Sequence, residues 1–140
     1  MAITQTQCTI FKTNLLKGLE NFNTGAPYVY KIALYSANAT LNASTLVYTT
    51  SGEITGASYT AGGKVLVPTV PTSSDGVAFI SFANVTWSPA NFTCRGALIY
   101  NSTTGAAVAV LNFGADKTAA NSFTITFPTA NATNAIIRIS

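Results

Sequence analysis

The sequence CRGALIYNSTTGAAVAVLNF, residues 94–113, decides the fold class of this chain. Two apolar runs, 94–100 and 106–113, flank the segment 101–105, which carries the turn-forming residues Asn, Ser, Thr and Gly. Short runs rich in Val, Ile, Leu and aromatic residues, bounded by such turns, are typical of β-strands. This stretch therefore predicts two strands separated by a turn.

The same alternation of apolar runs and turns continues toward both ends of the chain. Further strands are expected at 28–35, 45–50, 64–70, 122–127 and 135–139, with a weaker one at 53–59. Turn-forming segments 114–121 and 128–134 separate the later strands. Regular short strands with this punctuation predict a mainly β chain folded as an antiparallel β-sandwich or jelly roll.

Two of these strands carry more specific signals. Residues 77–87 follow the turn Ser74-Asp75-Gly76 and are apolar on both faces, which predicts one central strand. The strand 64–70 follows a Gly62-Gly63 turn, and its prolines, Pro68 and Pro71, place it at a sheet edge or cut it short.

One segment near the start has a helical period instead. Its apolar residues recur every three or four positions, with Leu16 beside them: Cys8, Phe11, Leu15, Leu19 and Phe22. The pattern predicts one helix over 8–22, ending in the segment 21–27. Such a helix either covers an open edge or face of the sheet or docks onto a neighbouring subunit. We expect a single domain, with an N-terminal arm and helix over 1–24 and a β-sandwich body over 25–140.

The composition is apolar and poor in charge. Of the 140 residues 48% are hydrophobic and 8% charged, against about a quarter charged in an average soluble chain. A charged surface opposes self-association, so this composition favours a subunit buried among other subunits. The seven basic residues are scattered singly, which argues against nucleic acid as a partner. The sequence predicts neither a membrane span nor a signal peptide, because it lacks a long apolar run and its start, MAITQTQCTIFK, has no basic and apolar export pattern.

The residue types argue against an enzyme. The chain has no histidine, which removes Ser-His-Asp triads, Cys-His pairs and His-containing zinc sites. The four carboxylates show no paired spacing: Glu20 lies in the expected helix, Glu53 begins a weak strand, and Asp75 and Asp116 lie in turns. No calcium loop or phosphate loop occurs, and Gly62-Gly63-Lys64 reads as a turn. We therefore expect no catalytic residues, metal or cofactor, and no small-molecule ligand.

Three residue classes have two interpretations each. Cys8 and Cys94 are expected to be buried reduced thiols, with a disulfide between them as the alternative. Six N-x-[ST] sequons are expected to stay unmodified, because a chain rich in Asn, Ser and Thr contains them by chance, with a glycosylated secreted protein as the alternative. Seven aromatic residues are expected to line the core or its rim, with a carbohydrate platform or a protein interface as the alternative: Tyr28, Tyr30, Tyr35, Tyr48, Tyr59, Phe92 and Tyr100.

Several stretches together carry a resemblance to a known family. They are QTQCTIFKTNLLKGLENF (5–22), YKIALYSANATLNASTLVYT (30–49), GASYTAGGKVL (56–66), RGALIYN (95–101), AVAVLNFGADK (107–117), FTITFP (123–128) and NAIIRIS (134–140). The chain resembles, over nearly its whole length, small virion structural proteins of tailed bacteriophages, of the capsid decoration or cement kind. The resemblance brings no catalytic motif with it.

The resemblance implies a non-enzymatic subunit of the virion, assembled in the host bacterial cytoplasm. Its partners would be the major capsid protein and copies of itself, with a trimer favoured. Such a subunit stabilises the shell by binding between capsid subunits. The helix supplies the candidate contact residues, with its lysines facing an acidic shell: Phe11, Lys12, Leu15, Leu16, Lys17, Leu19 and Phe22. Arg95, in an apolar strand, needs a carboxylate or carbonyl partner, within the chain or across a subunit interface.

Two other functional classes compete with the decoration role. A tail, neck or fibre-associated virion protein, including a module that binds host glycans, would need an exposed aromatic cluster with polar groups nearby. A hydrolase acting on the host envelope is disfavoured by the missing histidine and the unpaired carboxylates.

Overall fold

The computed structural model describes residues 2–23 and 25–140, and this part of the chain is mainly β with one short helix, as the sequence predicts. All ladders between its strands are antiparallel, and they build three sheets. The elements are β1 (Thr6–Gln7), α1 (Thr9–Leu16), β2 (Tyr30–Tyr35), β3 (Lys64–Leu66), β4 (Thr72–Ser74), β5 (Val77–Ile80), β6 (Val85–Trp87), β7 (Phe92–Asn101), β8 (Ala107–Ala119), β9 (Phe123–Ile125) and β10 (Ile137–Ile139).

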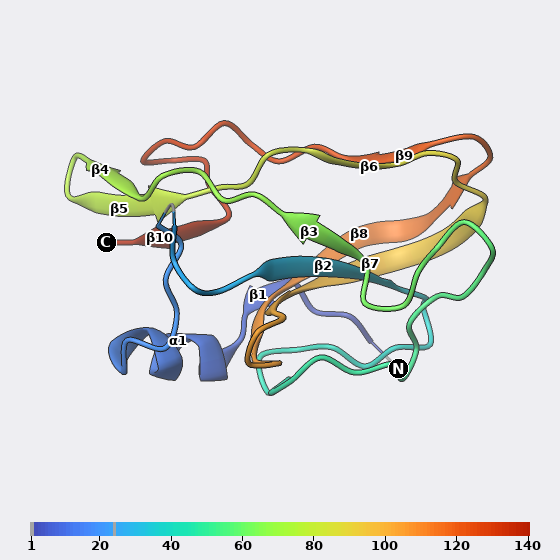
Figure 1. Ribbon diagram of the computed structural model, residues 1–140, viewed down its shortest axis with the longest axis horizontal. Coiled ribbons are helices and arrows are strands. Elements are labelled where there is room, and N and C mark those ends of the chain that lie inside the picture. Colours follow the sequence, from blue (N-terminus) through green and yellow to red (C-terminus); the bar gives the residue numbers. More distant parts are fainter. Residues whose placement is uncertain (1, 24) are drawn as a thin grey trace.

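The largest sheet has the strand order β1-β8-β7-β2-β3 (Figure 1). Its centre is the β7–β8 hairpin, the pair of strands that the opening stretch of sequence predicts. Ala97, Leu98 and Ile99 of β7 are fully buried although they point to alternate faces of the sheet. Both faces of the sheet are therefore covered at its centre.

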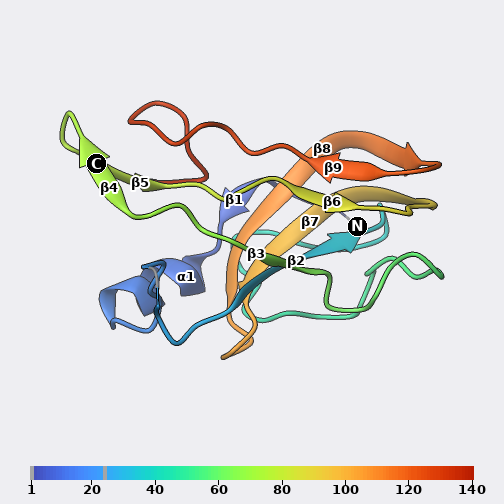
Figure 2. The ribbon, with the colours of Figure 1, turned by 45° about the horizontal axis from the view of Figure 1, so that its top comes forward.

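The two smaller sheets, β10-β5-β4 and β6-β9, follow one another along the molecule (Figure 2). The β6–β9 sheet lies over one face of the largest sheet, and the three-stranded sheet lies beyond the ends of its strands, near α1. Aromatic side chains fill the space between the layers at the β6–β9 end. The ring of Phe92 on β7 lies 6.3 Å from that of Trp87 on β6 and 5.6 Å from that of Phe123 on β9. Two sheet layers packed over an apolar core make the fold sandwich-like, as the sequence predicts.

The prediction of one central strand over 77–87 is wrong. The segment forms two strands, β5 and β6, which belong to different sheets. Between them, residues 81–83 pair with 67–69 instead: Thr69 N–H donates to the Ser81 carbonyl at 2.8 Å, and Ala83 N–H to the Val67 carbonyl at 2.9 Å. The segment is apolar on both sides because it passes from one sheet to the next and buries side chains of both parities on the way.

The predicted turn over 114–121 is also wrong for most of its length, because β8 continues to Ala119. Residues 117–119 pair with 92–94, whereas Asn112 pairs with Gly96, so the register shifts between these points. Gly114, with a φ of 81°, lies in the extra residues of β8 at this shift. The residue preferences of a bulge and of a turn are alike, because both need left-handed or irregular backbone. Gly and Asp in this segment therefore predicted a turn where the strand has a bulge.

Two predicted strands reduce to single bridges. In the segment 45–50 only Val47 bridges, to Ala106, and in 53–59 only Glu53 bridges, to Tyr35. Single backbone hydrogen bonds hold these segments in place of a ladder, such as those from Tyr48 N–H to the Gly105 carbonyl and from Ile54 N–H to the Leu34 carbonyl. The Glu53 carboxylate adds to them, because it accepts hydrogen bonds from Tyr48, Tyr59 and the Gly62 amide. The predicted strand 64–70 also shortens to β3, which lies at the edge of its sheet as its prolines indicate.

The helix is shorter than the predicted range 8–22 and ends at Leu16. Gly18 adopts a φ of 73°, and its N–H donates to the Leu15 carbonyl at 3.2 Å while Leu19 N–H donates to the Asn14 carbonyl at 2.9 Å. This pair of bonds is a Schellman motif, which satisfies the last carbonyls and stops the helix. The apolar spacing continues beyond the helix to Phe22 because that side chain is buried in the core, whereas Leu19 is exposed.

Candidate interaction surface

The helix side carries most of the residues that the sequence proposes for partner contact, and these residues divide into two groups. Phe11 and Phe22 are buried, and the Phe22 ring stacks on Tyr30 with 4.5 Å between centroids. Both belong to the core of the chain and do not lie on the surface. The interpretation that the segment covers its own sheet is therefore the one that the structure supports, and the first group has no part in an exposed surface.

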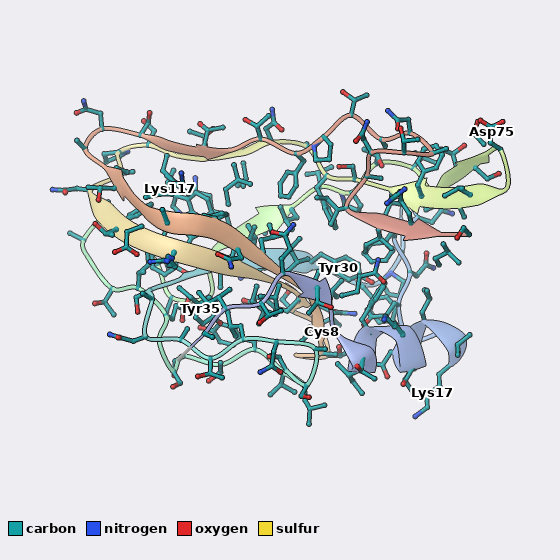
Figure 3. The ribbon with its side chains drawn as sticks, turned by 180° about the vertical axis from the view of Figure 1, so that it is seen from behind. Cys8, Lys17, Tyr30, Tyr35, Asp75 and Lys117 are labelled. Carbon is teal, nitrogen blue, oxygen red and sulfur yellow. The ribbon has the colours of Figure 1, made fainter. Side chains whose placement is uncertain are left out.

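The second group is exposed. Leu16 is 90% exposed and Leu19 44%, and Lys12 and Lys17 are exposed beside them, with Lys17 extending away from α1 (Figure 3). Leu15 is half-buried and forms the border between the two groups. We call the exposed set, Lys12, Leu16, Lys17 and Leu19, the helix surface.

Arg95 lies apart from the helix surface, on β7 beside the irregular part of β8. Its guanidinium Nη1 is 3.3 Å from Oδ1 of Asp116, and the two side chains are 39% and 56% exposed. The partner of Arg95 is thus internal to the chain, and the pair contributes little to stability because water screens it. Asp116 is in a strand and not in the predicted turn.

A second exposed apolar surface lies on β3 and on the residues that adjoin β2 and β3, and sequence reasoning missed it. In the register of β2 and β3, Tyr30 pairs with Leu66 and Lys31 with Val65. Val29 and Val67 are therefore the next pair of positions along these two neighbouring segments. Val29, Val65 and Val67 are 45%, 55% and 63% exposed. We call these three residues the valine surface. Their alternation with buried neighbours indicated a strand, but it could not tell which face another layer would cover.

Three of the four carboxylates lie apart from one another and have separate local roles. Glu53 holds the loop beside β2 through its three donors, Asp116 pairs with Arg95, and Asp75 occupies the turn between β4 and β5 with a φ of 53°. Asp75 lies at the tip of that hairpin, at one end of the molecule (Figure 3). Among the described residues, no three His, Cys, Asp or Glu side chains come together as a metal site would need.

Glu20 is the exception, because it is buried. It lies beyond the end of α1 and not within the helix as predicted, and it is 6% exposed. Its Oε1 accepts hydrogen bonds from the Tyr30 hydroxyl at 3.0 Å and from Asn101 Nδ2 at 2.9 Å. Burial raises the pKa of the Glu20 carboxyl, and hydrogen bonds from Asn101, Tyr30 and the nearby Asn14 side chain offset part of that increase. Tyr30 and Asn101 are distant from Glu20 in the sequence and lie on β2 and β7, so no local sequence signal marks this cluster.

The remaining chemistry-bearing side chains belong to the core. Cys8 and Cys94 are free and fully buried, as predicted, and burial raises their pKa values to about 11 and about 12. The aromatic residues also follow the prediction of a core or rim position. Five of the seven are buried and two are partly buried and packed against the core: Tyr30, Tyr35, Tyr59, Phe92 and Tyr100, then Tyr28 and Tyr48.

Two findings concern a possible membrane span and the likeness to known proteins. In the part of the chain that the structure describes, no helix has the length and apolar character needed to cross a membrane. In comparisons with known proteins, no family model, no curated protein and no solved structure matches this chain.

Proposed function

We propose that the chain is a non-enzymatic structural subunit of a tailed-phage virion that decorates and cements the outside of the capsid. The observation that carries the proposal is the exposure of large apolar side chains on a chain with little charge. Nine such side chains are between 44% and 90% exposed in the described residues, while the sequence has only seven basic and four acidic residues. Burial of each in an interface would contribute about 1 to 2 kcal/mol.

The helix surface is the proposed contact with the capsid shell. Leu16 and Leu19 supply apolar area, and Lys12 and Lys17 supply positive charge that would complement an acidic shell surface. A subunit that binds where shell proteins meet stabilises the assembled shell, because it binds the assembled state and not the separated subunits. The family resemblance of residues 5–22 supports the same assignment.

The valine surface is the proposed contact between copies of the chain. Val29, Val65 and Val67 lie on one face at the edge of the largest sheet, where they are free of contacts from the described part of the chain that would bury them. Exposed contiguous apolar residues of this kind mark protein interfaces. A trimer, placed at threefold positions of the shell, is the assembly that we propose.

A tail, neck or fibre-associated role is the alternative within the same class. Its glycan-binding form is less well supported, because it needs an exposed aromatic cluster and five of the seven candidate aromatics are buried.

The first test is a cryo-EM reconstruction of the virion that contains the chain. Density for the chain on the capsid lattice at threefold positions, with α1 toward the shell, is the expected result. Density restricted to the neck or tail would refute the cement role and leave a structural subunit of another kind. Absence of the chain from purified virions, checked by mass spectrometry, would refute the whole proposal.

A second test uses variants of the two surfaces. Leu16→Asp should abolish binding to shells prepared without the subunit while the variant stays folded and keeps its oligomeric state. Val67→Asp should reduce the oligomer to monomers in analytical ultracentrifugation. Ser73→Asp adds the same charge at an exposed position of β4 and is the matched control. Equal behaviour of all three variants would show that neither surface is an interface.

A further inference from the structure

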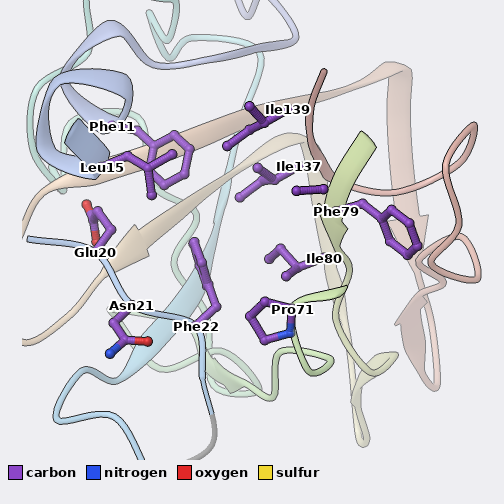
Figure 4. Close-up of a pocket in the computed structure, with 11 residues that line it drawn as sticks. Phe11, Leu15, Glu20, Asn21, Phe22, Pro71, Phe79, Ile80, Ile137 and Ile139 are labelled. Carbon is purple, nitrogen blue, oxygen red and sulfur yellow. The ribbon is translucent and has the colours of Figure 1, made fainter. Parts of the chain in front are cut away.

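A pocket of about 200 Å³ lies between α1 and the three-stranded sheet. Its floor consists of buried apolar side chains, among them Phe11 of α1, Phe22 and Ile137 of β10 (Figure 4). Its mouth is formed by more accessible side chains, since Leu15 is half-buried and Ile139 is half exposed. The hydrophobic core of the chain therefore borders a hollow that opens to the surface beside the helix.

The depth of this pocket is apolar, and its acidic residue does not face the opening. Glu20 contributes to the wall, but its Oε1 accepts hydrogen bonds from Tyr30 and Asn101 and its Oε2 is buried. The other polar residue of the described lining, Asn21, is exposed. A polar group that entered the pocket would lose its water without gaining a partner at the floor. The pocket therefore suits a hydrocarbon side chain.

Exposed apolar side chains continue outward from the lining of the pocket. Leu16 and Leu19 of the helix surface are each next in sequence to a lining residue, and so is Val70, which precedes Pro71. All three side chains are exposed. A pocket for one anchor side chain, surrounded by apolar contacts that exclude water, is the usual anatomy of an interface hot spot.

The exposed charge on the helix beside the pocket is positive. Lys12 and Lys17 are exposed, and the only ion pair between described side chains joins Arg95 to Asp116. Two uncompensated lysines favour an acidic partner. A second copy of the chain does not fit this description, because its exposed aspartates, Asp75 and Asp116, have no exposed large apolar side chain beside them in the sequence.

We propose that this pocket receives one bulky apolar side chain from an acidic segment of the shell protein. The inference rests on the proposed contact between the helix surface and the shell, and it names the anchor of that contact. A cavity of about 150 Å³ lined by Leu, Ile and Phe holds benzene, so a pocket of about 200 Å³ accommodates the side chain of leucine, isoleucine, methionine or phenylalanine. Carboxylates that flank this side chain then lie near Lys12 and Lys17.

The chemistry of the pocket is tested with a synthetic peptide, acetyl-Asp-Glu-Leu-Asp-Glu-amide. It is titrated at pH 7 into the full chain, labelled with ¹³C in its isoleucine methyl groups. Shifts should localise to Ile80, Ile137 and Ile139, with a Kd on the order of 1 mM. Alanine in place of the peptide's leucine should weaken binding about tenfold or more, because less apolar area is buried. Asn and Gln in place of its acidic residues should weaken binding about threefold to tenfold at low salt.

Two matched variants of the chain test the position of the site. Ala78 is an exposed residue of β5 that lines the pocket, so Ala78→Leu should fill part of it and weaken binding of the leucine peptide about tenfold or more. Ala83→Leu makes the same change at an exposed position outside the described lining and should leave binding unchanged. Both changes are at exposed positions, so both variants should keep the Tm of the parent chain to within a few degrees.

The inference is overturned if the leucine peptide gives no saturable shifts, if the alanine peptide binds equally well, or if Ala78→Leu binds the peptide as well as Ala83→Leu does. Equal binding of the uncharged peptide refutes the acidic character of the partner. These results do not depend on the virion assignment, because the isolated chain and a synthetic peptide are used.

Binding to shells prepared without the subunit separates this inference from the proposed function. Ala78→Leu and Leu16→Asp should both lose binding to the shell, while Ala83→Leu keeps it. If Leu16→Asp loses binding and Ala78→Leu keeps it, the helix surface is the contact and the pocket is not its anchor. If both variants bind shells normally, the proposed contact of the helix surface with the shell is wrong, even where the peptide occupies the pocket.

Discussion

The adjacent glycines before β3 provide a matched pair of substitutions with different expected costs. Both adopt left-handed backbone, with φ of 96° at Gly62 and 80° at Gly63. A Cβ at Gly62 would lie 3.4 Å from the Tyr100 hydroxyl, which is an ordinary contact. A Cβ at Gly63 would lie 1.7 Å from the carbonyl oxygen of Ile32. Substitution by alanine therefore strains the backbone at both positions but produces a collision at only one.

The size of the difference follows from this geometry. An alanine in left-handed backbone costs about 1 to 2 kcal/mol, and that is the full cost expected for Gly62→Ala. For Gly63→Ala the distance to the Ile32 oxygen must double to reach 3.4 Å, and the displaced atom belongs to the backbone of β2, which pairs with β3. Overpacking of this kind adds about 1 to 3 kcal/mol or more. We expect Gly63→Ala to lose about 2 to 5 kcal/mol of the free energy of unfolding.

The measurement is equilibrium unfolding in guanidinium chloride, followed by the fluorescence of Trp87, the only tryptophan in the chain. The midpoint of Gly63→Ala should fall well below that of Gly62→Ala, at an unchanged slope. Equal midpoints for the two variants would refute the reasoning, because the shared backbone strain would then account for the whole effect. If β3 still pairs with β2 in Gly63→Ala, so that the residues of the valine surface keep their positions, that result would count against the role of this turn in holding β3 on β2.

Three further predictions concern the buried residues. Burial raises the pKa of Glu20, so the folded state binds the proton more tightly than the unfolded state. The stability that this group contributes is therefore complete at acid pH and falls as pH rises through the raised pKa. Glu20→Gln should remove this pH dependence from unfolding curves measured at several pH values. Cys8 and Cys94 should react with a thiol reagent at neutral pH only after unfolding, and rapid reaction of the native chain would contradict their burial. Leu98→Ala, at a fully buried position, should cost about 2 to 5 kcal/mol in thermal unfolding, against about 0.5 kcal/mol or less for the exposed Leu16→Ala.

The strands and core were predictable where the signal is local. Alternation and turn residues around 94–113 gave the β7–β8 hairpin, and Pro68 gave the edge position of β3. The extent of β8 was not predictable, because Gly114 at a bulge has the same residue preferences as a glycine at a turn. The end of α1 was missed for the opposite reason: Gly18 alone stops the helix, while the apolar spacing continues to Phe22.

The candidate sites show the same limit. The exposed leucines and lysines of the helix surface could be selected from their helical spacing, but the burial of Phe11 and Phe22 depends on Tyr30 and on other elements that no helix pattern contains. The sequence places Glu20 in the helix and does not indicate its burial, because its partner Asn101 lies at the far end of β7. Contacts that link distant segments are set by packing and leave no periodic signal in the sequence.

The position of β1 at the outer edge of the largest sheet affects when the chain can fold during its synthesis. Thr6 lies opposite Val110, and Cys8 N–H donates to the carbonyl of Val108. The first strand and the start of the helix must therefore wait until most of the chain has left the ribosome before they find their partner. Pairings between such distant segments form slowly, since the closing of a long loop precedes any gain from contacts. The emerging N-terminal segment, with its apolar side chains still uncovered, is the part of the chain where we expect chaperone binding during translation.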